Sequence, residues 1–227
     1  DVKAATPAWT AIKPAIGAAT TDNIVAIAVA PGNADLIYVG HRNGNVYKTV
    51  NGSAATPTWT QVDTNGVGLP NRRVGRIVFD PNNVQRVYVC FGGYADANNF
   101  GATNLWRTVD GASTWTNVTS NLPLMPIYGL AIRPDNSNVL YAATDLGVYG
   151  SEDAGVTWSA TNVGPATVST ADVFFMAHYL VAGTHGRGVF QVPVLPPPPD
   201  VTPPTLTTTP ATTVTNFSPV AFRFGFS

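Results

Sequence analysis

Charged and helix-forming side chains are scarce in this chain of 227 residues. Charged residues make up 11% of the chain and the formal net charge is −1, which is unlike the basic footprint of a nucleic-acid-binding protein. The chain has one Glu (Glu152), three Lys and two Met, so few helices are expected. No apolar run approaches the ~20 residues that cross a bilayer. We therefore expect no nucleic-acid partner and no membrane span.

Cysteine is almost absent as well. Cys90 stands alone in the alternating run RVYVCFGG, so no disulfide can form within the chain. We expect a buried and inert thiol, because burial raises the pKa of a thiol. The low Lys content, together with abundant Thr, Asn and Gly, favours an exported protein, so we expect a secreted or cell-surface location.

The abundant residues are Thr, Val, Gly, Asn and Pro, a composition typical of many short strands joined by tight turns. The chain also repeats itself. Prolines 31, 81 and 134 recur at intervals of 50 and 53 residues, within or near the range of propellers and other repeat arrays. The similar units cover residues 24–62, 74–118, 127–163 and, in shorter form, 171–194.

Each full unit divides into four strands, labelled a to d. Strand a ends at a proline, as in IVFDP, because proline cannot continue a central ladder. A polar turn leads to strand b (RVYVC), a Gly-containing loop to strand c (NLWRT), and an Asp or Asn turn to strand d (TWTNV). The sequence therefore predicts an all-β chain, a β-propeller of about four antiparallel blades.

The N-terminal segment PAWTAIKP matches strand d without a preceding a, b or c, and the last unit lacks strand d. Two arrangements remain open. The segment could complete the fourth blade and close a four-bladed ring, which removes open sheet edges. It could equally end an absent blade of a larger propeller.

Composition also divides the chain. We expect the propeller at residues 1–194 and a stiff Pro-rich linker at 195–204. Residues 205–227 are Thr-rich and alternating, and resemble the opening of a bacterial immunoglobulin-like repeat. About thirty residues cannot bury a core alone, so this would be a partial domain.

The turns before strand d carry a recognisable motif: SEDAGVTW at 151–158, TVDGASTW at 108–115 and TVNGSAATPTW at 49–59. The motif resembles the Asp box, or BNR repeat, of sialidase-like, xyloglucanase-like and sortilin-type propellers. The resemblance implies a c–d turn on the rim, away from the ligand face. We expect structural roles, a backbone-binding turn and a tryptophan between blades, for Asn51, Trp59, Asp110, Trp115, Asp153 and Trp158.

Strand direction alternates, so the b–c loops and d–a connections share the face opposite the Asp boxes. By resemblance this second face is the ligand surface. The d–a connections place Asp63, Arg72 and Arg73 there. The candidate ligand-binding residues are His41, Arg42, Tyr94, Asp96, Asn99, Phe100, Asp145, His185 and Arg187. Exposed aromatic side chains among Asn and Asp are typical of sugar-binding loops. An ordinary polar loop has the same composition, so this alternative stays open.

No catalytic residue is assigned. His41 and His185 lack a third ligand nearby, so we expect no metal site and no cofactor. Sialidase-like and xyloglucanase-like enzymes need an arginine triad with a Tyr nucleophile, or paired carboxylates in a cleft, and neither set is evident. The sequence favours a non-enzymatic bacterial module that binds a polysaccharide or another extracellular protein, or has a structural role. The alternative is a fragment of a secreted glycoside hydrolase of the xyloglucanase or sialidase-like type.

Overall fold

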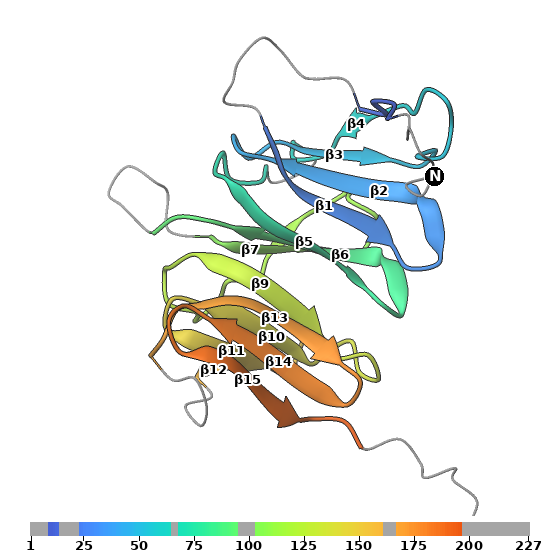
Figure 1. Cartoon of the computed structure of the whole chain (residues 1–227). Helices are drawn as coiled ribbons and strands as arrows, with labels where there is room; N and C mark the ends of the chain where they lie inside the picture. The colour runs from blue at the N-terminus through green and yellow to red at the C-terminus, as the bar shows by residue number, and fades with distance from the viewer. Residues whose placement is uncertain (1–8, 14–22, 65–67, 95–102, 161–166, 197–227) are drawn as a thin grey trace, which may run out of the picture. The chain divides into compact units, whose positions relative to one another are not determined.

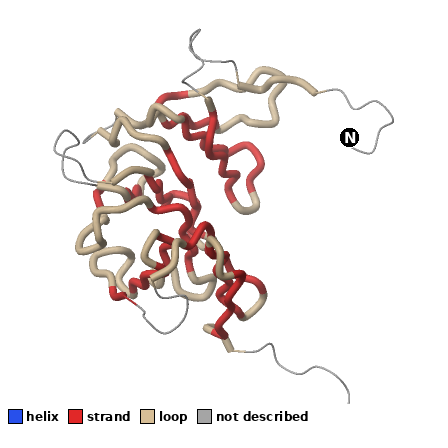
Figure 2. The backbone as a smooth tube through the Cα atoms, turned by 60° about the vertical axis from the view of Figure 1, so that its left-hand side comes forward, coloured by secondary structure: helices blue, strands red, loops and turns tan. Residues whose placement is uncertain are grey.

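The described part of the chain consists of antiparallel sheets and the loops that connect their strands. The computed structural model describes residues 9–13, 23–64, 68–94, 103–160 and 167–196. Within these ranges Figure 2 shows strands and loops and no helix. The chain separates into two compact units between Pro196 and Pro197, and all described residues belong to the first. The all-β prediction is confirmed.

Four sheets follow one another along the chain (Figure 1), and their strands pair in chain order. We call them blades one to four. The strands are β1 (Ile24–Ala30), β2 (Asn33–His41), β3 (Val46–Thr49) and β4 (Thr60–Gln61); β5 (Val74–Asp80), β6 (Asn83–Phe91), β7 (Leu105–Thr108) and β8 (Thr116–Asn117); β9 (Ile127–Ile132), β10 (Leu140–Thr144), β11 (Gly147–Ser151) and β12 (Ser159–Ala160); and β13 (Thr170–Met176), β14 (Tyr179–Thr184) and β15 (Gly188–Pro193).

The predicted strand order a to d is confirmed in the first three blades, and the fourth blade has three strands. Strand a ends where proline was expected to end it. β1 ends one residue before Pro31 and β5 one residue before Pro81. Proline lacks the N–H that the next ladder position needs, so the chain turns there into strand b.

The cores lie between adjacent blades rather than within any one of them. Strand b of each blade supplies large apolar side chains to this packing, as the alternating pattern of a strand between two sheets requires. Between blades one and two, the ring of Tyr38 meets Phe79 edge to face at 5.4 Å. Leu105 and Leu140 lie in the core between blades two and three, and Leu180 in the core between blades three and four. Each blade is therefore stabilised by its neighbours.

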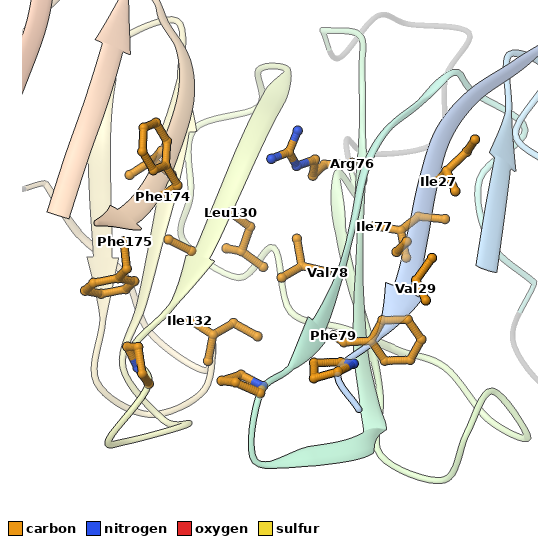
Figure 3. A pocket seen from close by; sticks show the side chains of 16 residues that line it. Ile27, Val29, Arg76, Ile77, Val78, Phe79, Leu130, Ile132, Phe174 and Phe175 are labelled. Atoms are coloured by element: carbon orange, nitrogen blue, oxygen red, sulfur yellow. The ribbon is translucent and has the colours of Figure 1, made fainter. Parts of the chain in front are cut away.

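The innermost strands, β1, β5, β9 and β13, are neighbours in that order (Figure 1). They surround a cavity of about 510 Å³, and Figure 3 shows side chains from all four around it. Arg76 on β5 forms an ion pair with Asp172 on β13 at 3.4 Å. The cavity is otherwise lined mainly by apolar side chains. It has few convergent polar groups, so it is a poor candidate for a ligand site.

The two terminal blades expose apolar side chains towards this cavity. Ile27 on β1 lines the cavity and is 66% exposed, and Phe174 on β13 lines it and is 43% exposed; Met176 on β13 is 51% exposed but does not line it. On β13 these two side chains lie on the face opposite Val173 and Phe175, which pack against blade three. No other described blade covers that face.

The N-terminal segment contacts blade one. The indole N–H of Trp59 donates to the carbonyl oxygen of Ile12 at 2.9 Å, and the ammonium of Lys13 lies 4.4 Å from the centre of the Tyr47 ring. Residues 9–13 thus contact blade one. Within the described residues, β15 is an edge strand that pairs with β14 alone. Both arrangements predicted from the sequence place this segment beside blade one.

The same indole contact recurs between the blades. Trp115 donates to the carbonyl oxygen of Val62 at 2.7 Å, and Trp158 donates to that of Val118 at 3.1 Å. Each acceptor lies three residues after the tryptophan of the preceding unit, and Ile12 lies three residues after Trp9 in the same way. Residues 9–12 are therefore related to blade one as strand d of one blade is related to the next.

Candidate functional site

The Asp-box carboxylates are occupied by their own turns. In blade two, the Oδ1 of Asp110 accepts the backbone N–H of Thr114 at 2.9 Å and the hydroxyl of Thr108 at 2.7 Å. Its Oδ2 accepts the hydroxyl of Thr114 at 2.7 Å. These bonds close the turn between β7 and β8.

Blades three and one repeat the turn, blade three with an aspartate and blade one with an asparagine. Asp153 accepts the N–H of Thr157 at 2.8 Å and its hydroxyl at 2.6 Å. In blade one the amide oxygen of Asn51 accepts the N–H of Thr58 at 2.9 Å. Because an amide closes the turn as a carboxylate does, the box does not depend on negative charge. In each of the three blades the box side chain is therefore bound within its own turn.

Hydrogen bonds from Thr114 and Thr157 lower the pKa of Asp110 and of Asp153 to about 2. Since the folded-state pKa is depressed, the charged boxes stabilise the fold above the ordinary aspartate value near 3.8, and this contribution is lost as the pH falls towards 2. We expect the double variant Asp110→Asn, Asp153→Asn to flatten the fall in melting temperature between pH 4 and pH 2. Calorimetry at steps of pH checks this. Equal slopes for the variant and the original chain would contradict it.

On the opposite face, the b–c loops and d–a connections meet in a cleft of about 500 Å³. It lies where blades one, two and three adjoin. We call it the arginine cleft, because three guanidinium groups contribute to its walls. Its polar and aromatic lining residues are Arg42, Asn71, Arg72, Arg73, Tyr94 and Tyr128.

Close backbone packing positions the arginines. The b–c turn of blade one contains Gly44 at φ +100°, where a Cβ would lie 2.6 Å from the backbone of Pro70 and of Arg72. The b–c loop of blade two is tied to the same connection, because the N–H of Gly92 donates to the carbonyl oxygen of Arg73 at 2.9 Å. Arg72 is buried beneath these loops, while Arg42 and Arg73 are exposed.

Asp145 lies beside the cleft and gathers three hydroxyl groups. Its carboxylate accepts hydrogen bonds from Tyr94, from Ser169 at 2.8 Å and from Tyr128 at 3.2 Å. Partial burial alone would raise the pKa of Asp145, but these hydrogen bonds outweigh it and lower the pKa. The bond to Asp145 raises the pKa of Tyr94 to about 12. The group is thus a charged aspartate that holds two neutral tyrosines.

The structure brings Arg42, Tyr94 and Asp145 together among the predicted ligand residues. His41 is 1% exposed, because β2 continues to this residue and its ring packs on Tyr47 at 5.3 Å. His185 and Arg187 are exposed in the b–c turn of blade four. Asp96, Asn99 and Phe100 lie outside the described residues.

One residue of the d–a connections has a structural role, and the sequence did not predict three further residues of the site. Asp63 is buried and accepts the N–H of Val46 at 3.1 Å, which makes it structural. Asn71, Tyr128 and Ser169 were not predicted as site residues. They belong to no motif. The sequence signal that Asn71 and Ser169 carry is their position near the end of a d–a connection, the position that drew attention to Arg72 and Arg73. Tyr128 lies on β9 just after such a connection.

The described ranges offer neither a cluster of metal-ligand side chains nor a membrane-spanning helix. These ranges contain no group of three or more His, Cys, Asp or Glu side chains that could hold a metal ion. No helix long and apolar enough to cross a membrane occurs in them. Cys90 is fully buried, and burial raises the pKa of its thiol to about 12.

Antiparallel blades whose two outer strands are joined by Asp-box turns, with a loop-built cleft on the opposite face, define a β-propeller of the BNR type. Residues 6–186 match the family model described as the DUF6242 beta propeller domain. The chain belongs to this family.

A curated relative is a xyloglucanase of Hypocrea jecorina (strain QM6a), 33% identical over a match of 128 residues that covers 50% of this chain and 15% of that protein. Among solved structures, the GH74 xyloglucanase from Xanthomonas campestris aligns with a TM-score of 0.55 and 16% identity over 75% of this chain and 29% of its own. An auxiliary nutrient binding protein from Bacteroides thetaiotaomicron aligns with a TM-score of 0.53 and 12% identity, over 75% of this chain and 38% of its own. This chain thus spans a minor part of each of them.

Proposed function

We propose that this propeller is a non-catalytic binding module of an exported or cell-surface bacterial protein, and that its loop face binds glycan or protein. The observation that carries the proposal is the arginine cleft itself. It is a concave site with a few convergent polar groups and exposed tyrosine, built by loops on a rigid framework of blades.

The hydrogen-bonding of the cleft supports binding over hydrolysis. Glycoside hydrolysis requires two carboxyl groups about 5–10 Å apart, one of them able to give or take a proton. Among the described residues, one carboxylate, that of Asp145, contacts the tyrosines of the cleft. Its lowered pKa and three hydroxyl donors make it a poor general acid.

A fragment of a glycoside hydrolase is the second candidate. The 33% identity with the xyloglucanase of Hypocrea jecorina favours it. Asp96 would then be the partner carboxyl to test, since it belongs to the long b–c loop of blade two. This candidate requires the chain to cleave a polysaccharide and not merely to retain it.

Binding and cleavage can be separated on the purified chain. We expect retardation of the chain in gels that contain polysaccharide, without release of reducing ends from xyloglucan or other glycans. The same assays are run on the variants Asp145→Asn and Asp96→Asn and on the double variant. Robust hydrolysis that these substitutions abolish would overturn the proposal in favour of the hydrolase.

A further inference from the structure

The arginine cleft concentrates positive charge on a chain whose net charge is −1. Arg42, Arg72 and Arg73 face the cleft, and no carboxylate lines it within the described residues. Three of the described arginines elsewhere are neutralised by ion pairs, whereas Arg107 and Arg187 form none with a described residue. The ion pairs in the described ranges are Arg76–Asp172, Arg86–Asp80 and Arg133–Asp135. Neither Arg42 nor Arg73 forms an ion pair with another described residue, so both remain available to a ligand.

The neighbouring aspartate does not cancel this charge by contact. Both oxygens of Asp145 are engaged, Oδ1 by Ser169 and Oδ2 by the two tyrosines. The effect of the aspartate is instead to fix Tyr94 and Tyr128 beside the arginines. Three guanidinium groups therefore lie next to two oriented phenol rings.

The tyrosines add an apolar surface to a cationic site. Tyr94 is 60% exposed although its hydroxyl group is bound, so a large part of its ring is open to solvent. Tyr128 is half-buried on β9. Aromatic faces of this kind pack against the C–H face of a pyranose ring, and guanidinium groups bind carboxylates through paired N–H donors.

We propose that the arginine cleft binds an acidic polysaccharide, one whose sugars carry carboxylate groups, as polyuronates do. The inference rests on the proposed binding function and assigns its ligand class. The sugar ring would lie against Tyr94, and its carboxylate would take hydrogen bonds from Arg73 and Arg42. A repeating uronate supplies both features in each unit of the chain.

The construction of the cleft disfavours two other classes of acidic ligand, an acidic peptide and a nucleic acid. An extended peptide gains most of its affinity by adding a strand to an open sheet edge, whereas this cleft is lined by turn and loop segments such as Gly92–Tyr94 and Asn71–Arg73. A nucleic acid would require a basic surface extending over many phosphates, and the basic residues here are confined to one site.

The test compares one polymer in two charge states. Binding of the full chain to polygalacturonate and to its fully methyl-esterified form is measured by biolayer interferometry, with xyloglucan as a neutral glycan. We expect binding to polygalacturonate that weakens with salt, and at least about tenfold weaker binding to the ester. We expect a loss of about tenfold for Arg73→Gln, because a charge-assisted hydrogen bond is removed.

Arg133→Gln is the matched control. It removes the same charge from the opposite face, where Arg133 pairs with Asp135, and it should leave binding unchanged. Melting temperatures establish that both variants fold. Equal binding of acid and ester, an equal loss from both substitutions, or binding of xyloglucan alone would overturn the acidic-ligand inference while leaving a glycan-binding module. Failure to bind any of these glycans, with capture of an acidic peptide or single-stranded DNA instead, would overturn the inference and the glycan function together.

Discussion

Replacing Trp115 with phenylalanine is expected to destabilise the propeller by about 2–3 kcal/mol, or roughly 5–10 °C in melting temperature for a chain of this size. The Trp115 side chain is 4% exposed between blades one and two, and its indole N–H is the donor to the carbonyl oxygen of Val62. Phenylalanine retains most of the apolar packing but leaves that carbonyl oxygen buried without this donor. Thermal or denaturant unfolding measures the loss.

Trp59→Phe is the matched control. Its bond to the carbonyl oxygen of Ile12 is solvent-exposed, so water replaces the donor and the cost should stay below about 1 kcal/mol. Equal losses for the two variants would show that the aromatic volume, and not the indole hydrogen bond, stabilises the junction between blades.

Gly44→Ala is expected to cost about 2–4 kcal/mol and to weaken ligand binding at the arginine cleft. Two effects combine at this residue. Its φ of +100° is unfavourable for any side chain, at about 1–2 kcal/mol. A Cβ would also lie 2.6 Å from two backbone atoms of the connection that carries Arg72, so the turn and the connection must separate. Unfolding and polygalacturonate binding are the two measurements.

Gly186→Ala separates these two effects. Gly186 occupies the equivalent turn in blade four with φ +86°, but a Cβ there would meet nothing within 4 Å. We expect this variant to lose about 1 kcal/mol, the cost of the backbone conformation alone. If both alanine variants lost the same stability and bound ligand equally, close packing at Gly44 would not position the cleft.

The blades were predictable because each one repeats the same local signals. A proline after strand a and an Asp box before strand d mark the boundaries of a blade without any knowledge of its neighbours. The position of the N-terminal segment was not predictable in this way. Its Trp-Thr-x-Ile pattern suits the outer strand of any blade, and its contact with blade one joins Trp59 to a carbonyl oxygen 47 positions earlier.

The candidate site was predicted in part for the same reason. Alternation of strand direction indicated which loops share a face, and so placed Arg42, Tyr94 and Asp145 together. It did not indicate that β2 continues to His41, which is decided by a backbone bond from its N–H to Asn45. Tyr128 was missed because its role depends on Asp145, a partner in the b–c turn of its blade.

The tryptophan contacts also mean that the segment which is stable as a unit does not coincide with one sequence repeat. Each Asp box closes a turn in its own blade, but its indole N–H satisfies a carbonyl group of the blade before it. Each motif therefore caps its predecessor. A fragment cut at the sequence boundary of a repeat would lose the donor that protects its last strand, whereas one extended to the next tryptophan would keep it. The boundaries at which such a chain can be divided, or lengthened by duplication, are consequently set by indole groups and not by the start of strand a.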